Sequence, residues 1–270
     1  MTTQKFYVYF LAGLILFIAA CQPAVLAQRM PQPSGVKFNS FTATYYLSRD
    51  SENQSLLSTE EVILADFFSN ARLTGIIRTI PQKYQGRSVE VNVQNVTDAS
   101  GNNIPYKIDT KDDNLVINIG NPSIYLFGSQ TFRIKYQTSN VVNLSDLKNE
   151  FLLNVNGRGW DQGFERIGAF LHIPKSFSSN LISKPTCYIG HPKSTSYDCT
   201  VNQQDLPEET LISVKSSNPV GANSALVLKT AFQTATFSNE KRSLTPLLLV
   251  LPLLIGLLVL ALWFKKTRRS

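Results

Sequence analysis

The stretch Thr131–Gln137, TFRIKYQ, alternates apolar and polar side chains with a period of two. In an extended chain, Phe132, Ile134 and Tyr136 point to one face, and the residues between them point to the other. A strand that buries one face against a core shows this alternation. The stretch therefore predicts a half-buried β-strand.

The same alternation recurs through the middle of the chain, and no segment there has the period of an amphipathic helix. The stretches DASGNN, KDDN, GNPS and NGRG supply turn residues between the apolar runs. We expect an all-β fold, a β-sandwich that is immunoglobulin-like in general architecture. The further strands expected are Val36–Ser48, Leu57–Phe67, Arg72–Ile80, the SVEVNVQNV segment with Val89, Val91 and Val93, the NLVINIG segment with Leu115, Ile117 and Ile119, Glu150–Asn156, Ala169–Ile173, Thr210–Lys215 and Leu226–Phe237.

The N-terminal region has the build of a secretory signal. Phe6–Ala20 is apolar and follows a short segment whose only charged side chain is Lys5. Residues 1–27 are expected to be a signal peptide that is cleaved after Ala27. Alternatively, the sequence IAAC fits a lipoprotein signal that ends before Cys21, which would then be lipidated.

The C-terminal region predicts a membrane anchor. Residues Leu244–Phe264 contain no charge over 21 positions, enough to cross a bilayer as a helix. The tail 265–270, KKTRRS, carries four positive charges, which places it in the cytoplasm. Residues 238–243 form a short stalk, and residues 28–237 are expected to be an extracytoplasmic body on the bacterial cytoplasmic membrane.

The charge of the body is balanced. Between Gln28 and Glu240 there are 19 basic and 19 acidic residues, so the net charge of +7 comes from the two ends. Nucleic acid is therefore not an expected partner. The expected partners are the membrane and either an envelope protein or an anionic polymer, for which the basic set Arg72, Arg78, Lys83 and Arg87 is a candidate patch.

Two cysteines remain in the body, Cys187 and Cys199. An exported pair that flanks a turn predicts a disulfide that staples a hairpin. The alternative adds His191 as a zinc ligand, but zinc needs three or four well-placed ligands. We expect no metal and no cofactor.

The sequence contains no nucleophile elbow, P-loop, dinucleotide fingerprint or calcium loop. Asp161 and Glu165 can be imagined as paired carboxylates, and His172 as a base. Solvated loop charges around Trp160 and a satisfied histidine explain these residues more simply. No catalytic residue is assigned, and the protein is not expected to be an enzyme.

Arg78 lies inside the apolar stretch Gly75–Pro81, GIIRTIP, and invites two interpretations. A turn near Ser69 and Asn70 would fold the preceding segment back and bring Glu60 or Glu61 opposite Arg78, as an internal ion pair. Alternatively, Arg78 faces outward and binds an anion. The apolar residues beside it favour the internal pair.

Four stretches in order, EEVILADF with GIIRTIP, INIGNPSIYLFGSQTFRIKY and EFLLNVNGRGW, resemble the extracytoplasmic N-terminal domain of the DUF2207 family of bacterial membrane proteins. The resemblance covers about Phe41 to Pro174 and is seen here in a short, single-pass form. It implies a location and a fold, and no established chemistry. The residues that carry it are Glu61, Gly75, Arg78, Ile80, Pro81, Gly120, Pro122, Gly128, Gly157 and Trp160.

The sequence as a whole favours a membrane-anchored binding or assembly protein of the bacterial cell envelope. An envelope hydrolase and a structural spacer are the alternatives. Whether residues 175–240 extend the same sandwich or form a second one stays open at this point.

Overall fold

The computed structural model describes residues 35–84, 86–190 and 196–238. Within these residues the chain forms sixteen β-strands and one short helix, α2 (Lys175–Ser178). The all-β expectation is therefore confirmed. The described ranges contain no helix that is long and apolar enough to span a membrane.

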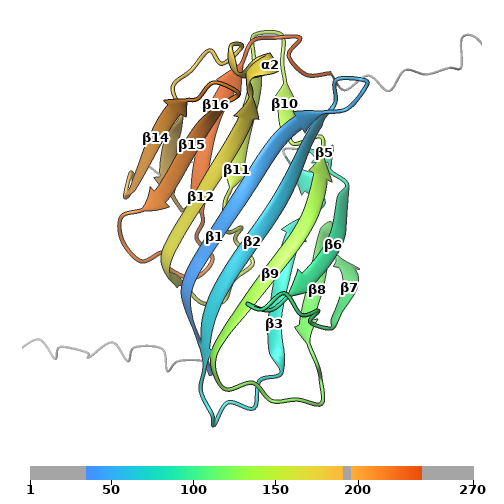
Figure 1. Ribbon diagram of the computed structural model, residues 1–270, viewed down its shortest axis with the longest axis vertical. Coiled ribbons are helices and arrows are strands. Elements are labelled where there is room, and N and C mark those ends of the chain that lie inside the picture. Colours follow the sequence, from blue (N-terminus) through green and yellow to red (C-terminus); the bar gives the residue numbers. More distant parts are fainter. Residues whose placement is uncertain (1–34, 85, 191–195, 239–270) are drawn as a thin grey trace, which may run out of the picture. The chain divides into compact units, whose positions relative to one another are not determined.

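The first layer is a seven-stranded sheet that runs across the front of Figure 1. β1 and β12 are parallel neighbours, and the other pairs in this sheet are antiparallel. In sheet order its strands are β14 (Cys199–Asp205), β15 (Glu209–Ser216), β12 (Phe164–Pro174), β1 (Val36–Arg49), β2 (Ser55–Phe67), β9 (Gly128–Ser139) and β6 (Val91–Thr97).

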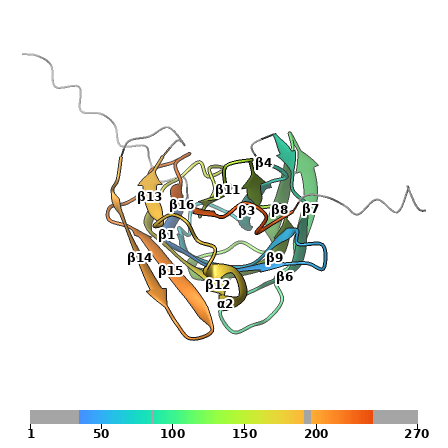
Figure 2. The same cartoon turned by 90° about the horizontal axis from the view of Figure 1, so that it is seen from above.

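The second layer is divided into two sheets, which lie on the concave side of the first (Figure 2). The strands β4 (Lys83–Tyr84) and β5 (Arg87–Ser88) form a separate small hairpin. The four-stranded sheet has the order β10 (Val142–Leu144), β11 (Asn149–Asn154), β16 (Leu226–Phe232) and β13 (Thr186–Ile189), and the three-stranded sheet has the order β3 (Gly75–Pro81), β8 (Asn114–Gly120) and β7 (Tyr106–Lys111).

The core lies between the two layers, because the strands alternate buried and exposed side chains and turn the buried ones inward. In β9, Phe132, Ile134 and Tyr136 are buried as the sequence predicts. In β2 every second residue is buried, and in β3 the buried residues are Ile76, Arg78 and Ile80. The apolar inner faces of the two layers thus pack into one cluster that holds the fold together.

The strand arrangement corrects two expectations. An immunoglobulin sandwich consists of antiparallel sheets, whereas here β1 pairs with β12 in parallel inside a seven-stranded sheet. The expected hairpin between β2 and β3 is also wrong, because β2 pairs with β1 and β9 while β3 pairs with β8 in the other layer. Period two specifies which residues face the core, but it does not specify which sheet a strand joins.

The segment after Pro174 belongs to the same fold. Its strands divide between the layers: β15 joins β12 in the large sheet, and β16 joins β11 in the four-stranded sheet. Phe232 of β16 is fully buried in the common core. No separate second sandwich is formed by the described residues of this segment.

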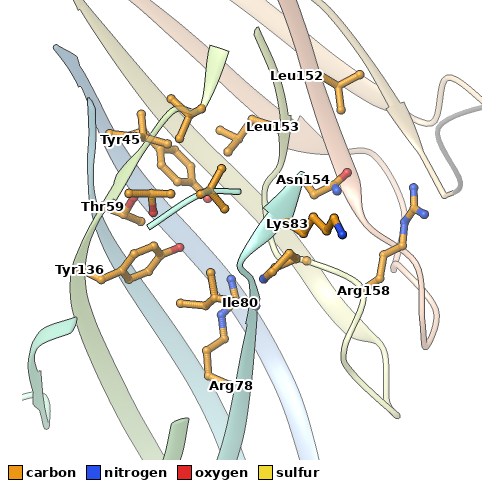
Figure 3. Close-up of a pocket in the computed structure, with 16 residues that line it drawn as sticks. Tyr45, Thr59, Arg78, Ile80, Lys83, Tyr136, Leu152, Leu153, Asn154 and Arg158 are labelled. Atoms are coloured by element: carbon orange, nitrogen blue, oxygen red, sulfur yellow. The ribbon is translucent and has the colours of Figure 1, made fainter. Parts of the chain in front are cut away.

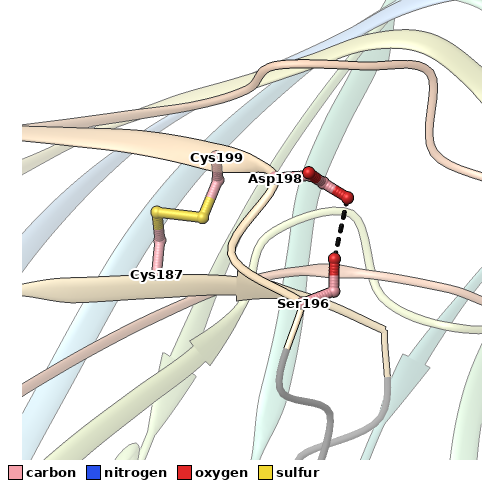
Figure 4. Close-up of a disulfide and its surroundings, with 4 residues drawn as sticks. All are labelled: Cys187, Ser196, Asp198 and Cys199. Atoms are coloured by element: carbon pink, nitrogen blue, oxygen red, sulfur yellow. Dashed lines mark hydrogen bonds between the residues drawn. A yellow bond between two sulfur atoms is a disulfide. The ribbon is translucent and has the colours of Figure 1, made fainter.

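The disulfide between Cys187 and Cys199 is present (Figure 4). It does not staple a hairpin, because β13 pairs with β16 and β14 pairs with β15. The bond instead joins the edge strand β13 of the four-stranded sheet to the edge strand β14 of the seven-stranded sheet. It therefore ties the two layers together at one side.

Several expectations fall outside the described residues. These are the signal peptide 1–27 with Cys21, the anchor Leu244–Phe264, the tail 265–270 and His191; of the stalk 238–243, only Ser238 is described.

Candidate functional site

Arg78 and Glu61 form an ion pair in the middle of the core. Arg78 projects from β3 and Glu61 from β2, so the pair joins the two layers. The Arg78 side chain is 3% exposed and that of Glu61 is fully buried. Arg78 Nε donates to Glu61 Oε2 at 2.7 Å, and its Nη2 donates to Glu61 Oε1. The contact is thus the two-pronged form that guanidinium and carboxylate groups favour.

Two tyrosines complete this network. The Tyr136 hydroxyl donates to Glu61 Oε1 at 2.7 Å, and the Tyr45 hydroxyl donates to the carbonyl oxygen of Val155 at 2.8 Å. Burial, followed by the nearby Glu61 carboxylate, raises the pKa of both tyrosines well above the ordinary value. Both hydroxyls therefore stay protonated and act as hydrogen-bond donors.

Arg78 remains charged in this setting. Burial alone would lower the pKa of its guanidinium, but the Glu61 carboxylate outweighs burial and raises it. The third nitrogen of the Arg78 guanidinium, Nη1, donates to the carbonyl oxygen of Thr79 at 2.8 Å. Arg78 is an internal structural residue, as the sequence favoured, although it reaches Glu61 across the layers and not along a hairpin.

The loop after β11 packs against the guanidinium of Arg78. A Cβ atom added to Gly157, whose φ is +72°, would lie 2.8 Å from Arg78 Nη1. The Trp160 ring centroid lies 5.8 Å from Arg78 Cζ, and the indole donates to the carbonyl oxygen of Asn156. Only glycine leaves room for Arg78 at the first of these positions.

The remaining motif residues lie along β3, β8 and β9. Gly75 pairs with Gly120, and a Cβ atom on Gly75 would lie 1.7 Å from the carbonyl oxygen of Ile119. This close approach explains glycine at the start of β3. Gly128 opens β9 with a positive φ, Pro122 follows β8, Ile80 is buried, and Pro81 ends β3.

A cavity of about 460 Å³ lies beside this network, between the layers (Figure 3). It lies where the second layer is divided, between β3 and β11. Figure 3 shows Tyr45, Thr59 and Tyr136 on one side of it and Asn154 and Arg158 on the other. The residues that line it are Tyr45, Leu57, Thr59, Arg78, Ile80, Pro81, Lys83, Val89, Tyr136, Thr138, Val141, Leu152, Leu153, Asn154, Gly157 and Arg158.

Three polar atoms of the lining are buried without a protein partner: Thr59 Oγ1, Asn154 Oδ1 and Arg158 Nε. Thr59 as a whole is only 4% exposed. Such atoms are rare in folded proteins because an unpaired polar group loses its hydrogen bonds to water. The sequence did not mark any of the three as a cavity residue, although Asn154 and Arg158 lie in the stretch EFLLNVNGRGW that carries the family resemblance.

The expected basic patch does not form. Arg78 is internal, and Arg87 donates to the carbonyl oxygens of Asn140 and Val142. Lys83 lines the cavity with a half-exposed side chain and lies 3.7 Å from Asp113. Arg72 lies in the loop that follows β2. Arg78 is thus buried and Arg87 is bonded to backbone carbonyl oxygens, so these two of the four residues do not contribute to a shared basic surface.

Glu165 and His172, which were considered for catalysis, are not brought together. Glu165 forms an ion pair with Lys37, whereas His172 binds Glu209 at 2.9 Å and stacks on Tyr46. Both lie on β12, seven residues apart, which corresponds to roughly 23 Å along a strand. The described part of the chain holds no cluster of three or more histidine, cysteine and acidic residues suited to a metal ion.

These features define an all-β protein with a ligand-sized, largely apolar cavity between its layers. The chain belongs to the DUF2207 family: the family's model, described as the N-terminal domain of a predicted membrane protein, matches residues 38–217. The resemblance seen in the sequence is thus confirmed, and the match extends beyond the expected boundary at Pro174. No curated protein matches the sequence.

Three solved structures are similar to part of the chain. A putative protease from Parabacteroides distasonis is 7% identical with a TM-score of 0.42, and covers 73% of this chain and 40% of its own. An M1 zinc metallopeptidase from Deinococcus radiodurans is 12% identical with a TM-score of 0.43, and covers 72% and 42%. Leukotriene A4 hydrolase from Saccharomyces cerevisiae is 8% identical with a TM-score of 0.42, and covers 73% and 29%. The chain thus corresponds to less than half of each.

Proposed function

We propose that the protein is a single-pass membrane protein of the bacterial envelope whose extracytoplasmic β body binds a ligand and does not catalyse a reaction. Family membership supports the membrane association. The Cys187–Cys199 disulfide supports an oxidising, extracytoplasmic location for the body. The uncharged Leu244–Phe264 and the basic tail behind it support a C-terminal anchor.

The observation that carries the binding role is the cavity between the layers. Its volume of about 460 Å³ falls in the range that holds small ligands, roughly 300–1,000 Å³. Its walls come from both layers, so a bound molecule would contact the two sheets at once. The separation of Glu165 from His172 along β12 supports a binding role over a hydrolase built on these two residues.

Native mass spectrometry of the full chain, purified from its own membranes in mild detergent, tests this role. We expect a retained small molecule that is lost when Leu153→Trp fills the cavity. The control is Leu147→Trp, because Leu147 is 89% exposed and lies away from the cavity lining. A parent protein without a retained ligand would contradict the proposal, and so would equal retention in both variants.

Assembly with an envelope protein is the second candidate function. Ile124, Tyr125 and Phe127, which precede β9, are 55%, 59% and 72% exposed. This loop lies at the end of β2 and β9 where Phe67 pairs with Gly128. Ser238 bonds to Asn53 at the other end of β2, about 40 Å away for a strand of 13 residues. An anchor that follows Ser238 would hold the loop away from its own membrane and toward other envelope proteins.

Photocrosslinking in native membranes tests the assembly role. A photoreactive residue at Tyr125 should capture a protein with an apolar surface, whereas one at Leu147 should not. Equal capture from both positions would contradict assembly through this loop.

A further inference from the structure

The chemistry of the cavity lining narrows the class of ligand. Besides the rings of Tyr45 and Tyr136, the apolar walls are aliphatic. Leu57, Ile80, Val141 and Leu153 come from both layers. Such walls favour an alkyl chain, since each buried methylene group contributes about 0.8 kcal/mol. The apolar portion of the ligand is therefore expected to be an aliphatic chain, at least part of which lies in the cavity of about 460 Å³.

The charges of the lining are all positive. Arg78 is already neutralised by Glu61, which leaves the charges of Lys83 and Arg158 for a ligand. Arg158 Nη2 donates to the carbonyl oxygen of Gly190 at 3.5 Å, and no acidic side chain of the described lining faces it. None of the described residues that line the cavity is acidic. Lys83 contacts Asp113 only loosely, at 3.7 Å between exposed groups, so the lysine can turn toward an anion. The cavity thus favours a negatively charged head group.

The partnerless atoms add a requirement for hydrogen bonding. Arg158 Nε is a donor, and it would be satisfied by a phosphate or carboxylate oxygen. Asn154 Oδ1 is an acceptor, which an anion cannot satisfy but a ligand hydroxyl can. Thr59 Oγ1 can serve as donor or acceptor on the opposite wall. The head group should therefore carry both an anion and a hydroxyl group.

We propose that the cavity binds a single-chain anionic lipid with a free hydroxyl, the class to which lysophosphatidic acid belongs. The acyl chain lies among the aliphatic walls, the anionic group lies at Lys83 and Arg158, and the hydroxyl donates to Asn154. This inference rests on the proposed binding function and specifies its ligand.

Photoaffinity labelling of the full chain in phosphatidylcholine nanodiscs tests the proposal. The probe is a photoreactive lysophosphatidic acid, and the competitors are oleoyl lysophosphatidic acid, oleate and monooleoylglycerol. Label is expected on peptides that contain Ile80 or Leu153. Lysophosphatidic acid should compete at concentrations about tenfold below those of oleate, which lacks the hydroxyl, and of monooleoylglycerol, which lacks the charge.

Two variants distinguish loss of head-group binding from loss of folding. Lys83→Ala should weaken labelling about tenfold without loss of folding, because the Lys83 side chain is half exposed. Lys135→Ala, a similarly exposed lysine of β9 outside the lining, should leave labelling unchanged. Equal competition by monooleoylglycerol, or equal labelling of the two variants, would overturn the assignment of an anionic head group.

The same set of experiments distinguishes the two levels of inference. If no lipid protects Ile80 or Leu153 from labelling while native mass spectrometry still finds a ligand that Leu153→Trp removes, the lipid class is wrong and the binding function stands. If neither measurement finds a ligand, both are wrong.

Discussion

At the scale of single residues, the buried pair of Arg78 and Glu61 is the most consequential interaction. Removal of one partner leaves the other charge buried and unpaired, which typically costs 3–5 kcal/mol. We expect Arg78→Ala to reduce the free energy of unfolding by about 3 kcal/mol or more, and Glu61→Gln in the same chain to restore part of it, because the stranded carboxylate is then neutral.

Denaturant unfolding followed by the fluorescence of Trp160 measures these changes. Trp263→Phe removes the second tryptophan of the chain, so the signal reports on the body alone. Trp160 is buried beside Arg78 and will respond when the layers separate. Unfolding of Arg78→Ala within about 0.5 kcal/mol of the parent would rule out a structural role for the pair.

Replacement of Gly157 is predicted to destabilise the fold through the contact with Arg78 as well as through backbone strain. Gly157→Ala adds a Cβ atom 2.8 Å from Arg78 Nη1 at a φ of +72°. Gly101→Ala is a matched control, since Gly101 has a φ of +87° and nothing within 4 Å of a new Cβ atom. Both variants should lose about 1 kcal/mol to backbone strain, and Gly157→Ala should lose at least about 1 kcal/mol more.

The same unfolding assay gives both values. Equal losses for the two variants would mean that the contact with Arg78 is easily relieved. Lysine has a single terminal nitrogen in place of the planar guanidinium group, so Arg78→Lys removes the Nη1 atom. If the clash with Nη1 causes the extra loss of stability in Gly157→Ala, this loss should disappear in the Arg78→Lys background.

From the sequence, the partner of Arg78 was predicted to be Glu60 or Glu61, but the way in which the chain brings Glu61 to Arg78 was not predicted. The apolar neighbours Ile76 and Ile80 showed that Arg78 faces a core, and a buried arginine requires a carboxylate. Glu61 was a candidate because it lies nearby in the sequence. The cavity, in contrast, could not be predicted, because Thr59 lies on β2, far in the sequence from Asn154 and Arg158, and only the folded chain brings them together.

At the scale of elements, alternation predicted the half-buried strands and failed for strands without a buried face. β2, β8 and β9 alternate and were identified from the sequence. β7 is exposed at every position, and β14 is exposed at most of them, so neither has an apolar stripe facing the core. β13 has only four residues, too few for a period of two to be recognised.

The disulfide between β13 and β14 should stabilise the layered arrangement. Closing a loop of this length is worth about 3 kcal/mol in the chain-entropy model, and the sequence separation is 12 residues. We expect Cys187→Ser with Cys199→Ser to lose about that amount in the Trp160 assay, and a reducing agent to have the same effect on the parent.

A second readout locates the effect. Hydrogen exchange should accelerate most in β13 and β14, since these edge strands belong to different layers and are joined by the disulfide. Mass spectrometry of the unreduced protein should find the two cysteines linked. Two free thiols in protein from the native envelope would contradict the cross-layer bond.

At the scale of the whole molecule, the divided second layer relates the fold to its proposed use. A continuous second sheet would close the core against the large sheet, as in an ordinary sandwich. Here β3 belongs to one sheet and β11 to another, and the cavity lies between them. The buried pair of Arg78 and Glu61 fastens β3 to β2 beside this cavity, and the disulfide fastens the other sheet to β14. Both halves of the second layer are thus held while the space between them stays available.

The last prediction concerns the orientation of the chain in the membrane. The four basic residues after Phe264 exceed the net charge on the other flank of Leu244–Phe264, and the side with the basic excess normally stays in the cytoplasm. In cells whose outer barriers have been opened, an external protease should degrade the body, and a tag placed after Ser270 should remain protected. Lysis of the membrane should make the tag accessible, which controls for a tag that is intrinsically resistant.

Removal of the basic charges tests the cause of this orientation. Replacing the four basic residues at 265, 266, 268 and 269 with glutamine should increase the fraction of chains whose tag is cleaved from outside, because the asymmetry that sets the topology is then removed. Replacement of the same number of basic residues on the surface of the body, such as Lys107, Lys135, Lys175 and Lys215, should leave the tag protected, since charges far from a membrane span have little influence on orientation. A protected body with an accessible tag in the parent protein would reverse the topology, and the disulfide would then lie in the reducing compartment, where such bonds are rare.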